Sequence, residues 1–368
     1  MLVVLPTVRR VLGVGAFLFM LASTAGAQAE TPPQVIRFGL PGTLGQDGRT
    51  VPGGATNRVL YDELTKEFEK DGPKIEWSYY VNAGPGLNEA FAANQIDFTN
   101  YGDFPAVIAR AGGIKIKLLA PGTRGTSDSY LVVPPDSPAK SIADLKGKRI
   151  ALNMGRPWVL AFTHLAESQG LKLSDFQIFN LVMPDGDAAV ASHSVDATYT
   201  LDGLQLVGRG VGKILWSTRD APLDWKFSAE LFGREDFIDR YPETTYRIVK
   251  AAIRAAYRNS LPEAREAYLR DYASAQLIPY DLLLDSWKGR DLKPGLSPLF
   301  DPFTTAHYQQ VIDYAAQTKL TRKTFNTSDL LAPKMAEAAL AELKLGDFWV
   351  PLDAKGNPVA AGTSGASQ

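Results

Sequence analysis

Short apolar segments of strand character alternate with amphipathic segments of helical period along the first two thirds of the chain. Alternating residues predict strands at 34–40 and 74–81. Apolar residues three and four positions apart, at Val59, Leu60, Leu64 and Phe68, predict a helix between these strands. Strands that alternate with helices are typical of an α/β fold, in which a sheet is flanked by helices.

The same reading covers the rest of this part of the chain. Gly and Pro residues mark most of the predicted element ends. We predict further strands at 96–101, 114–122, 130–137, 148–155, 176–184, 195–200 and 212–218, an extended segment at 224–233, and helices at 87–95, 104–112, 141–147, 157–170 and 185–194.

From residue 235 the pattern becomes helical throughout, with an apolar stripe at Ile248, Ala252, Ile253 and Ala256. We expect these helices to return to the first α/β block and cover it. The predicted fold class is therefore α/β with two lobes, each a mixed sheet flanked by helices, and a hinge made of two chain crossings. The predicted bounds are 31–128 and 228–350 for lobe I, 129–227 for lobe II, and 354–368 for a flexible tail.

The N-terminus has the features of a cleavable signal peptide at residues 1–29. Arg9 and Arg10 precede an apolar run at 11–22, and small residues follow at 25–29. A membrane anchor is the alternative, but the run is shorter than the roughly 20 residues that a span needs. The two arginines also leave a twin-arginine export route open.

The composition excludes several kinds of chemistry. The chain has 45% apolar and 21% charged residues, a net charge of −1 and no cysteine. The charge gives no reason to expect nucleic acid as a partner, and no internal repeat of fixed period is apparent. Without cysteine the chain has no disulfide, thiol nucleophile or lipid-modified N-terminal Cys, so we expect an untethered periplasmic protein. The three histidines, His164, His193 and His307, show no catalytic or metal-binding motif, so we predict no enzyme, metal or cofactor.

Three segments together resemble one family. They are GPGLNEAFAANQIDFTNYGDFPAVIARAGG at 84–113, DSPAKSIADLKGKRIALNMG at 136–155 and DGDAAVASHSVDATYTLD at 185–202. They resemble the periplasmic substrate-binding components of ABC importers, in the branch for aliphatic sulfonates, taurine and nitrate. The resemblance covers about residues 34–205 strongly and the helical part more loosely. It implies a type II two-lobed fold, ligand-driven closure, and a permease and an ATPase as partners of a monomeric receptor.

The predicted turns from strand to helix suit an anionic ligand. The first N–H groups of a helix lack partners, and the helix dipole favours negative charge beside them. We expect ligand contacts at such turns, with candidates at Pro41-Gly42, Gly84-Pro85, Gly102-Asp103 and Gly155-Arg156-Pro157.

Arg156 and Trp158 stand where the family usually carries small hydroxyl residues at a helix start. Arg156 would bind a carboxylate or sulfonate through two N–H groups, and Trp158 would stack on an apolar or planar ligand. The alternative is a solvated arginine and a core tryptophan. Because of this departure from the family, a larger or aromatic organic anion or a sulfate ester is an alternative to the small sulfonates and nitrate that the resemblance implies.

The other candidates each have a structural alternative. Asp103 is expected as the N-cap of a helix, which would suit a ligand amine better than an anion, and Tyr101 as a wall of the cleft. Asp202 would pair a ligand amine or cap the next helix. We expect the 41–54 loop to be a lid or simply solvated. The remaining candidates lie on this loop, at lobe crossings or at strand ends: Thr43, Arg124, Ser129, Asn153 and Trp225.

Two other functions stay open at this point. Pyrimidine-synthesising enzymes share the fold that the resemblance implies, but they need Cys and His chemistry, and this chain has no Cys. The second is an accessory sensor that presents a ligand to a signalling receptor, which the sequence alone does not separate from transport. Capture of a small organic anion for an ABC importer is the leading hypothesis.

Overall fold

The computed structural model describes residue 1 and residues 30–44, 50–52, 55–81, 83–154, 156 and 158–359. Apart from Met1, the predicted signal peptide lies outside these residues, as do residues 360–368 of the predicted tail. Residues 354–359 are described, and there Asp353 accepts hydrogen bonds from the backbone of Lys355 and Asn357. Within the described part of the chain, no helix is long and apolar enough to cross a membrane.

The first sheet is mixed, and two segments of the chain supply its strands. β1 lies between β3 and β4 and runs parallel to both, while β2 pairs antiparallel with the end of β1. β11 returns from the distant part of the chain and inserts antiparallel between β4 and β5. The strands are β1 (Val35–Leu44), β2 (Thr50–Pro52), β3 (Lys74–Tyr80), β4 (Phe98–Gly102), β5 (Ile116–Arg124) and β11 (Ser228–Arg234).

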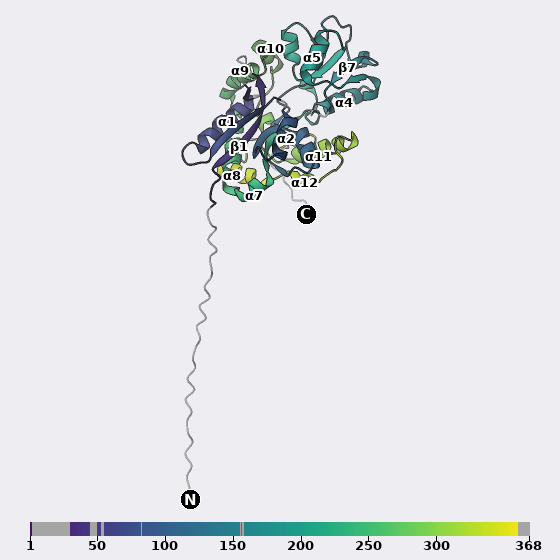
Figure 1. Ribbon diagram of the computed structural model, residues 1–368. Coiled ribbons are helices and arrows are strands. Elements are labelled where there is room, and N and C mark those ends of the chain that lie inside the picture. The colour runs from purple at the N-terminus through teal and green to yellow at the C-terminus, as the bar shows by residue number, and fades with distance from the viewer. Residues whose placement is uncertain are drawn as a thin grey trace. The chain divides into compact units, whose positions relative to one another are not determined.

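The second sheet has the order β10-β6-β9-β7-β8. β7 is parallel to β8 and β9, and β6 is antiparallel to β9 and β10. The prediction of two mixed sheets flanked by helices is confirmed (Figure 1). The strands are β6 (Tyr130–Val133), β7 (Arg149–Leu152), β8 (Gln177–Phe179), β9 (Ala197–Thr200) and β10 (Lys213–Ser217).

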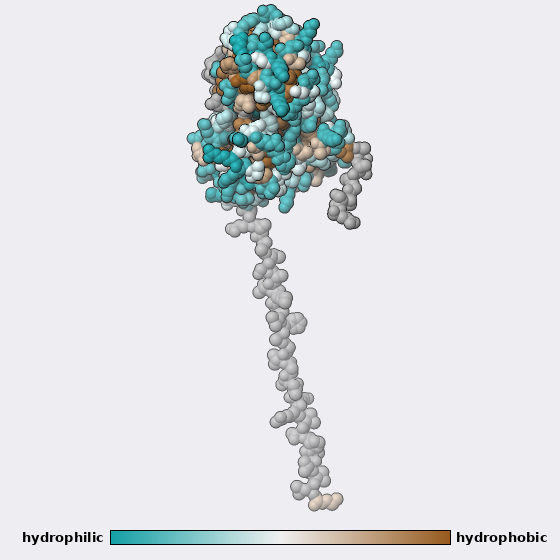
Figure 2. All heavy atoms as spheres, turned by 90° about the vertical axis from the view of Figure 1, so that its right-hand side faces the viewer, coloured by the Kyte–Doolittle hydropathy of each residue, from teal (hydrophilic) through white to brown (hydrophobic). Residues whose placement is uncertain are grey.

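The helices form where the sequence has its apolar stripes, and several begin with a proline in the first turn, where the missing N–H has no cost. The face drawn in Figure 2 is mostly hydrophilic, with hydrophobic patches of limited size. The helices are α1 (Ala55–Phe68), α2 (Gly84–Ala92), α3 (Asp103–Ala111), α4 (Val159–Ser168), α5 (Met183–Ala191), α6 (Gly203–Gly208), α7 (Glu235–Arg240), α8 (Pro242–Ser260), α9 (Arg265–Ala275), α10 (Tyr280–Ser286), α11 (Pro302–Gln317), α12 (Thr327–Leu330) and α13 (Lys334–Glu342).

Three expectations about elements need correction. Pro41 and Gly42 do not form a turn, because they lie inside β1, where Gly42 pairs with Pro52 of β2. The described parts of the predicted 41–54 loop therefore belong mainly to two antiparallel strands. The strand predicted at 176–184 ends at Phe179, and α5 begins at Met183, where Pro184 in the first turn favours a helix.

The C-terminal helices do not all cover the first sheet, as the sequence led us to expect. α8 and α13 share a core with Ile36, Phe38 and Leu40 of β1. In α9 and α10, by contrast, Leu269 and Leu283 pack in a core with residues of the second sheet, among them Val132. The helical part of the chain is thus divided between the two sheets.

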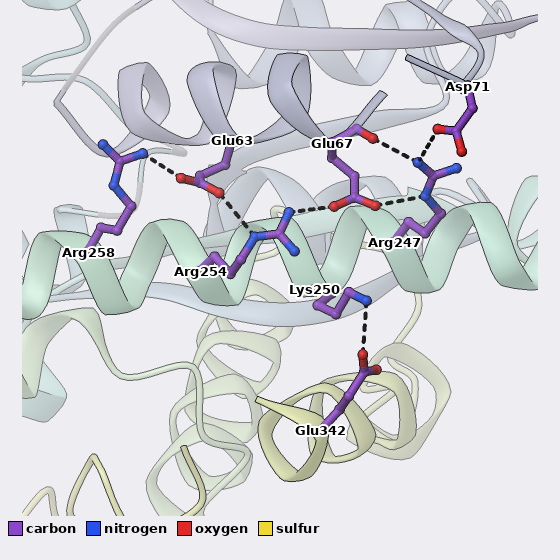
Figure 3. Close-up of polar contacts among 8 residues, drawn as sticks. All are labelled: Glu63, Glu67, Asp71, Arg247, Lys250, Arg254, Arg258 and Glu342. Atoms are coloured by element: carbon purple, nitrogen blue, oxygen red, sulfur yellow. Dashed lines mark hydrogen bonds and ion pairs between the residues drawn. The ribbon is translucent and has the colours of Figure 1, made fainter. Parts of the chain in front are cut away.

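A ladder of ion pairs fixes α1 to α8 on the outside of the first sheet (Figure 3). Glu63 accepts hydrogen bonds from Arg254 and Arg258, and Glu67 accepts them from Arg247 and Arg254. The Glu63 side chain is 5% exposed, so its two arginines compensate a largely desolvated carboxylate. Burial alone would raise the pKa of Glu67, but the hydrogen bonds from Arg247 and Arg254 lower it.

The structure reveals an internal repeat that we did not expect. Residues 84–103 and 183–202 form the same helix–strand unit at an offset of 99 positions, from α2 at 84 to α5 at 183. Asn94 and His193, 99 positions apart, both have positive φ angles, of 55° and 59°. At this offset six of the 20 positions carry the same residue, so the repeat is also present in the sequence, although no long run of identities makes it obvious.

Equivalent side chains also make equivalent contacts in the two copies. Arg37 of β1 binds the Asp97 carboxylate before β4, and Arg149 of β7 binds the Asp196 carboxylate before β9. The two sheets therefore contain the same helix–strand unit with the same arginine–aspartate contact.

Candidate functional site

The start of α2 is open to an anion. The residue before the helix, Ala83, has an unusual backbone conformation (φ 44°, ψ −120°), and among the described residues no side chain caps the first turn. Pro85 occupies the first turn, as predicted. The free N–H groups and the positive end of the helix dipole at this point favour a bound negative charge.

Neighbouring residues hold this helix start in place. A Cβ added to Gly84 would lie 2.5 Å from the Pro105 Cβ, so only glycine permits α2 to approach α3 this closely. Asn88 donates to the Pro105 carbonyl at 2.9 Å and accepts from the Tyr101 hydroxyl at 2.9 Å. Tyr101, which we expected as a cleft wall, is 2% exposed and instead supports α2 from behind.

Arg156 brings a positive charge to the same helix start. Its Nη1 atom lies 3.9 Å from the position that a Cβ of residue 84 would occupy. The side chain is half-buried, and among the described residues it has neither a hydrogen-bond nor an ion-pair partner. Burial lowers the pKa of Arg156, and no carboxylate of the described residues opposes this effect. A half-buried cation without a counter-charge beside an open helix N-terminus is an arrangement that suits an anionic ligand.

Trp158 adds an unused hydrogen-bond donor at the start of α4. It stands directly before the helix, it is 9% exposed, and within the described part of the chain no side chain caps the helix there. Its indole Nε1 atom is buried and has no hydrogen-bond partner among the described residues. The ring packs edge-on against Phe227, with 6.3 Å between centroids. Buried indole N–H groups normally find an acceptor, so this donor also points to an anion.

The Gly102-Asp103 turn is committed to internal structure. α3 begins at Asp103, with Gly102 as its N-cap, so Asp103 is not the N-cap that we expected. Its carboxylate is 1% exposed and accepts from the Ser228 backbone at 2.9 Å, while His307 Nε2 lies at 2.6 Å. Burial alone would lower the pKa of His307, but the hydrogen bond to Asp103 raises it. This turn holds β11 and α11 together and leaves no room for a ligand amine at Asp103.

Arg124 and Ser129 are also committed to structural contacts. Arg124 forms a buried ion pair with Asp301 at 2.7 Å, and Ser129 lies 2.8 Å from the Tyr199 hydroxyl. Both residues belong to the segment that joins the two sheets, and their contacts anchor it.

The remaining candidates lie at several places. Asp202 precedes α6 but does not cap it, and accepts a hydrogen bond from Gln205 at 3.0 Å. Asn153 is half-buried just beyond β7. Trp225 stacks on His164 with 5.4 Å between ring centroids. Thr43 belongs to β1, and its side chain lies outside the described residues. Of the predicted residues, the structure brings together Gly84, Pro85 and Arg156, with Trp158 two positions further along the chain.

No group of three or more His, Asp or Glu side chains among the described residues is placed to hold a metal ion.

Residues 74–263, just over half of the 368, match the family model described as NMT1/THI5 like. The chain belongs to the NMT1/THI5-like family. The predicted kinship with the binding proteins of ABC systems is confirmed by the relatives of this NMT1/THI5-like protein.

A solved structure of the periplasmic sulfonate-binding protein SsuA, from a candidate sulfonate ABC transporter of Methylobacillus flagellatus KT, is 40% identical. It covers 88% of this chain and 99% of its own, with a TM-score of 0.77. A candidate aliphatic sulfonates-binding protein of Bacillus subtilis (strain 168) is 24% identical over 76% of this chain and 82% of that protein. A namesake from Escherichia coli (strain K12) is 29% identical, and the match spans about half of its length, 51%. These relatives support a solute-binding role.

The sequence did not reveal several residues that shape this NMT1/THI5-like protein. His307 and Ser228 are far from Asp103 along the chain, and no local pattern links them. Asn88 and Asp187 occupy equivalent positions of the internal repeat. An alignment of the chain with itself at an offset of 99 would have identified that pair.

Proposed function

We propose that this protein is the solute-binding receptor of an ABC importer and that it captures a small organic anion at Arg156. The observation that carries the proposal is the half-buried Arg156 guanidinium, which has no acidic partner among the described residues and lies at the open start of α2. The sulfonate-binding relatives support a sulfonate as the anionic group.

The donors around Arg156 match such a group in number and type. A guanidinium offers two parallel N–H groups to a sulfonate or carboxylate. The start of α2, beside Arg156, offers backbone N–H groups as well. These donors together would meet the three oxygen atoms of a sulfonate group.

Exposed apolar residues support an organic body for the ligand. Val81 is 58% exposed between β3 and α2, and Val182 is 51% exposed directly before α5. Phe179, the last residue of β8, is 44% exposed. Because apolar side chains at the ends of the parallel strands would cover a carbon chain or ring, an alkyl or aromatic sulfonate or sulfate ester fits the proposal better than an inorganic ion.

Transport would use the two segments that cross between the sheets as a hinge. The segments are joined by a hydrogen bond from the Gly125 N–H to the Phe227 carbonyl at 3.2 Å, and Gly125 has a positive φ of 59°. Closure about this hinge would bring α2 and Arg156 around the ligand, and a membrane permease with its ATPase would receive it. We propose export to the periplasm by the 1–29 signal peptide and a monomeric receptor with lobes at 31–128 plus most of 228–350 and at 129–227, where α9 and α10 of the return segment pack with the second lobe.

A thermal-shift screen of the mature protein tests the proposal. Sulfonates, sulfate esters, nitrate and aromatic acids are each added in excess. A ligand at 100 times its Kd stabilises the folded state by about 2.7 kcal/mol, which raises the melting temperature measurably. No shift with any of these anions would contradict the receptor function.

A further inference from the structure

Two helices that belong to different sheets are joined by hydrogen bonds beside the candidate site (Figure 1). α4 follows β7 of the second sheet, whereas α11 packs on α3 beside the first sheet. The Tyr314 hydroxyl of α11 lies 3.2 Å from Thr163 Oγ1 of α4, and Gln310 Nε2 lies 2.9 Å from His164 Nε2. Gln310 and Tyr314 are four positions apart and therefore share one face of α11. We call these two hydrogen bonds the α4–α11 clasp.

The chemistry of the groups defines the direction of both hydrogen bonds. Thr163 donates its hydroxyl proton to the Val159 carbonyl at 3.0 Å, so its oxygen accepts from Tyr314. An amide nitrogen donates and does not accept, so His164 must accept at Nε2, which requires a neutral ring. Burial lowers the pKa of His164, and this favours the neutral ring near neutral pH.

Ring contacts hold each half of the clasp in its own part of the molecule. The Tyr314 ring packs edge-on against Phe104 of α3, with 5.9 Å between centroids. The His164 ring stacks on Trp225, in the segment that returns from β10 to β11, with 5.4 Å between centroids. Three of the four clasp residues are only half-buried. Half-buried polar contacts of this kind are typical of surfaces that separate and rejoin when parts of one chain move.

The clasp controls the position of Arg156 relative to α2. Val159, the first residue of α4, donates its N–H to the Arg156 carbonyl at 3.1 Å, so Arg156 moves with α4. At the other end, α11 packs on α3, and Pro105 of α3 packs against Gly84 at the start of α2. A movement that carries Arg156 away from the start of α2 would therefore also separate α4 from α11.

We propose that Gln310 and Tyr314 are positioning residues, which hold Arg156 over the start of α2 through the α4–α11 clasp. The proposal rests on the proposed anion-binding function. A contact that stabilises the ligand-binding arrangement raises the fraction of molecules that can bind, and so raises the apparent affinity. α11 lies outside residues 74–263, which match the family model, so that match does not imply the clasp.

The test measures the affinity for butane-1-sulfonate by isothermal titration calorimetry and the rate of its release by stopped-flow tryptophan fluorescence. Gln310→Ala and Tyr314→Phe each remove one hydrogen bond of the clasp, and Tyr314→Phe keeps the ring that packs on Phe104. We expect each variant to bind about 2- to 10-fold more weakly, through faster release. A merely structural contact would lower the melting temperature and leave affinity and release rate unchanged.

Gln309→Ala is the matched control, because Gln309 is exposed beside Gln310 and donates within α11 to Asp313 at 2.9 Å. It should bind like the wild type. Thr163→Val combined with Tyr314→Phe should bind no more weakly than Tyr314→Phe alone, because both substitutions remove the same hydrogen bond.

Unchanged affinity in folded Gln310→Ala and Tyr314→Phe, or additive losses in the double variant, would overturn the clasp while leaving the anion receptor intact. Failure of the wild type to bind butane-1-sulfonate would overturn the proposed sulfonate-binding function, and the role of the clasp with it.

Discussion

Substitution of Arg124 tests whether a buried, ion-paired arginine serves stability and not ligand binding. The sequence made Arg124 a candidate ligand contact, but the structure buries it. Its side chain and that of Asp301 are each 2% exposed, and Nη1 lies 2.7 Å from Oδ2. The guanidinium also donates to Thr304 Oγ1 at 3.0 Å and to the Leu299 carbonyl. Arg124→Met fills a similar volume but leaves Asp301 buried without its cation. Removal of one partner from a buried ion pair costs about 3–5 kcal/mol.

This loss corresponds to a measurable change in melting temperature. The part of the compact unit that the structure describes lies within residues 32–359. At about 2.1 cal/mol/K per residue, its unfolding entropy is about 0.7 kcal/mol/K, so the melting temperature should fall by about 4–7 °C. Differential scanning calorimetry measures the fall, and titration below the transition measures sulfonate affinity, which should not change.

Arg58→Met is the control for this experiment. The Arg58 side chain is 60% exposed and pairs with Asp271 at 3.2 Å, and such pairs contribute about 1 kcal/mol or less. If Arg124→Met melted like the wild type and lost sulfonate affinity, Arg124 would be a ligand residue and the reasoning from burial would fail.

Three further substitutions test other parts of the structure. Glu63→Gln removes a nearly buried carboxylate from its two arginine partners and should cost about 1.5–3 kcal/mol in urea unfolding, whereas an unchanged midpoint would show the ladder to be superficial. Burial raises the pKa of Glu230 to about 8, so the folded state holds a proton that the unfolded state releases above about pH 4.5, and stability must fall as pH rises between these values. Glu230→Gln should remove this slope and stabilise the protein at pH 8 by at least about 1 kcal/mol, and equal slopes in both proteins would contradict the assignment. Gly84→Ala places a Cβ 2.5 Å from that of Pro105, so α2 must shift and sulfonate affinity should fall, while Gly346→Ala, with open space around it, should change stability by about 0.5 kcal/mol or less.

Local patterns were sufficient for most of the elements. The apolar stripe and terminal glycines placed α3 within a residue or two, and alternation placed β3. The apolar run before Pro184 was misread as a strand, because periodicity does not separate a strand end from an exposed helix entry. Val182 in that run is in fact 51% exposed.

In the candidate site, too, local sequence patterns identified some residues and missed others. The role of Arg156 as a candidate ligand residue could be predicted from the sequence, because Arg156 stands where the family usually has small hydroxyl residues at a turn from strand to helix. The partners of Arg124 and Asp103 were not, because Asp301 and His307 lie 177 and 204 positions further along the chain. Only the folded chain brings such residues into contact, and these contacts decide which candidates are free to bind a ligand.

The affinity of the mature protein for butane-1-sulfonate, measured by calorimetry in the wild type and in Arg156→Met, tests the central claim most directly. The account predicts one site in the wild type and an affinity about 10- to 150-fold weaker in the variant, as expected for a charge-assisted contact. Because Arg156 has no acidic partner among the described residues, the variant should melt at the wild-type temperature or above it. Equal affinities in the two folded proteins would contradict the account.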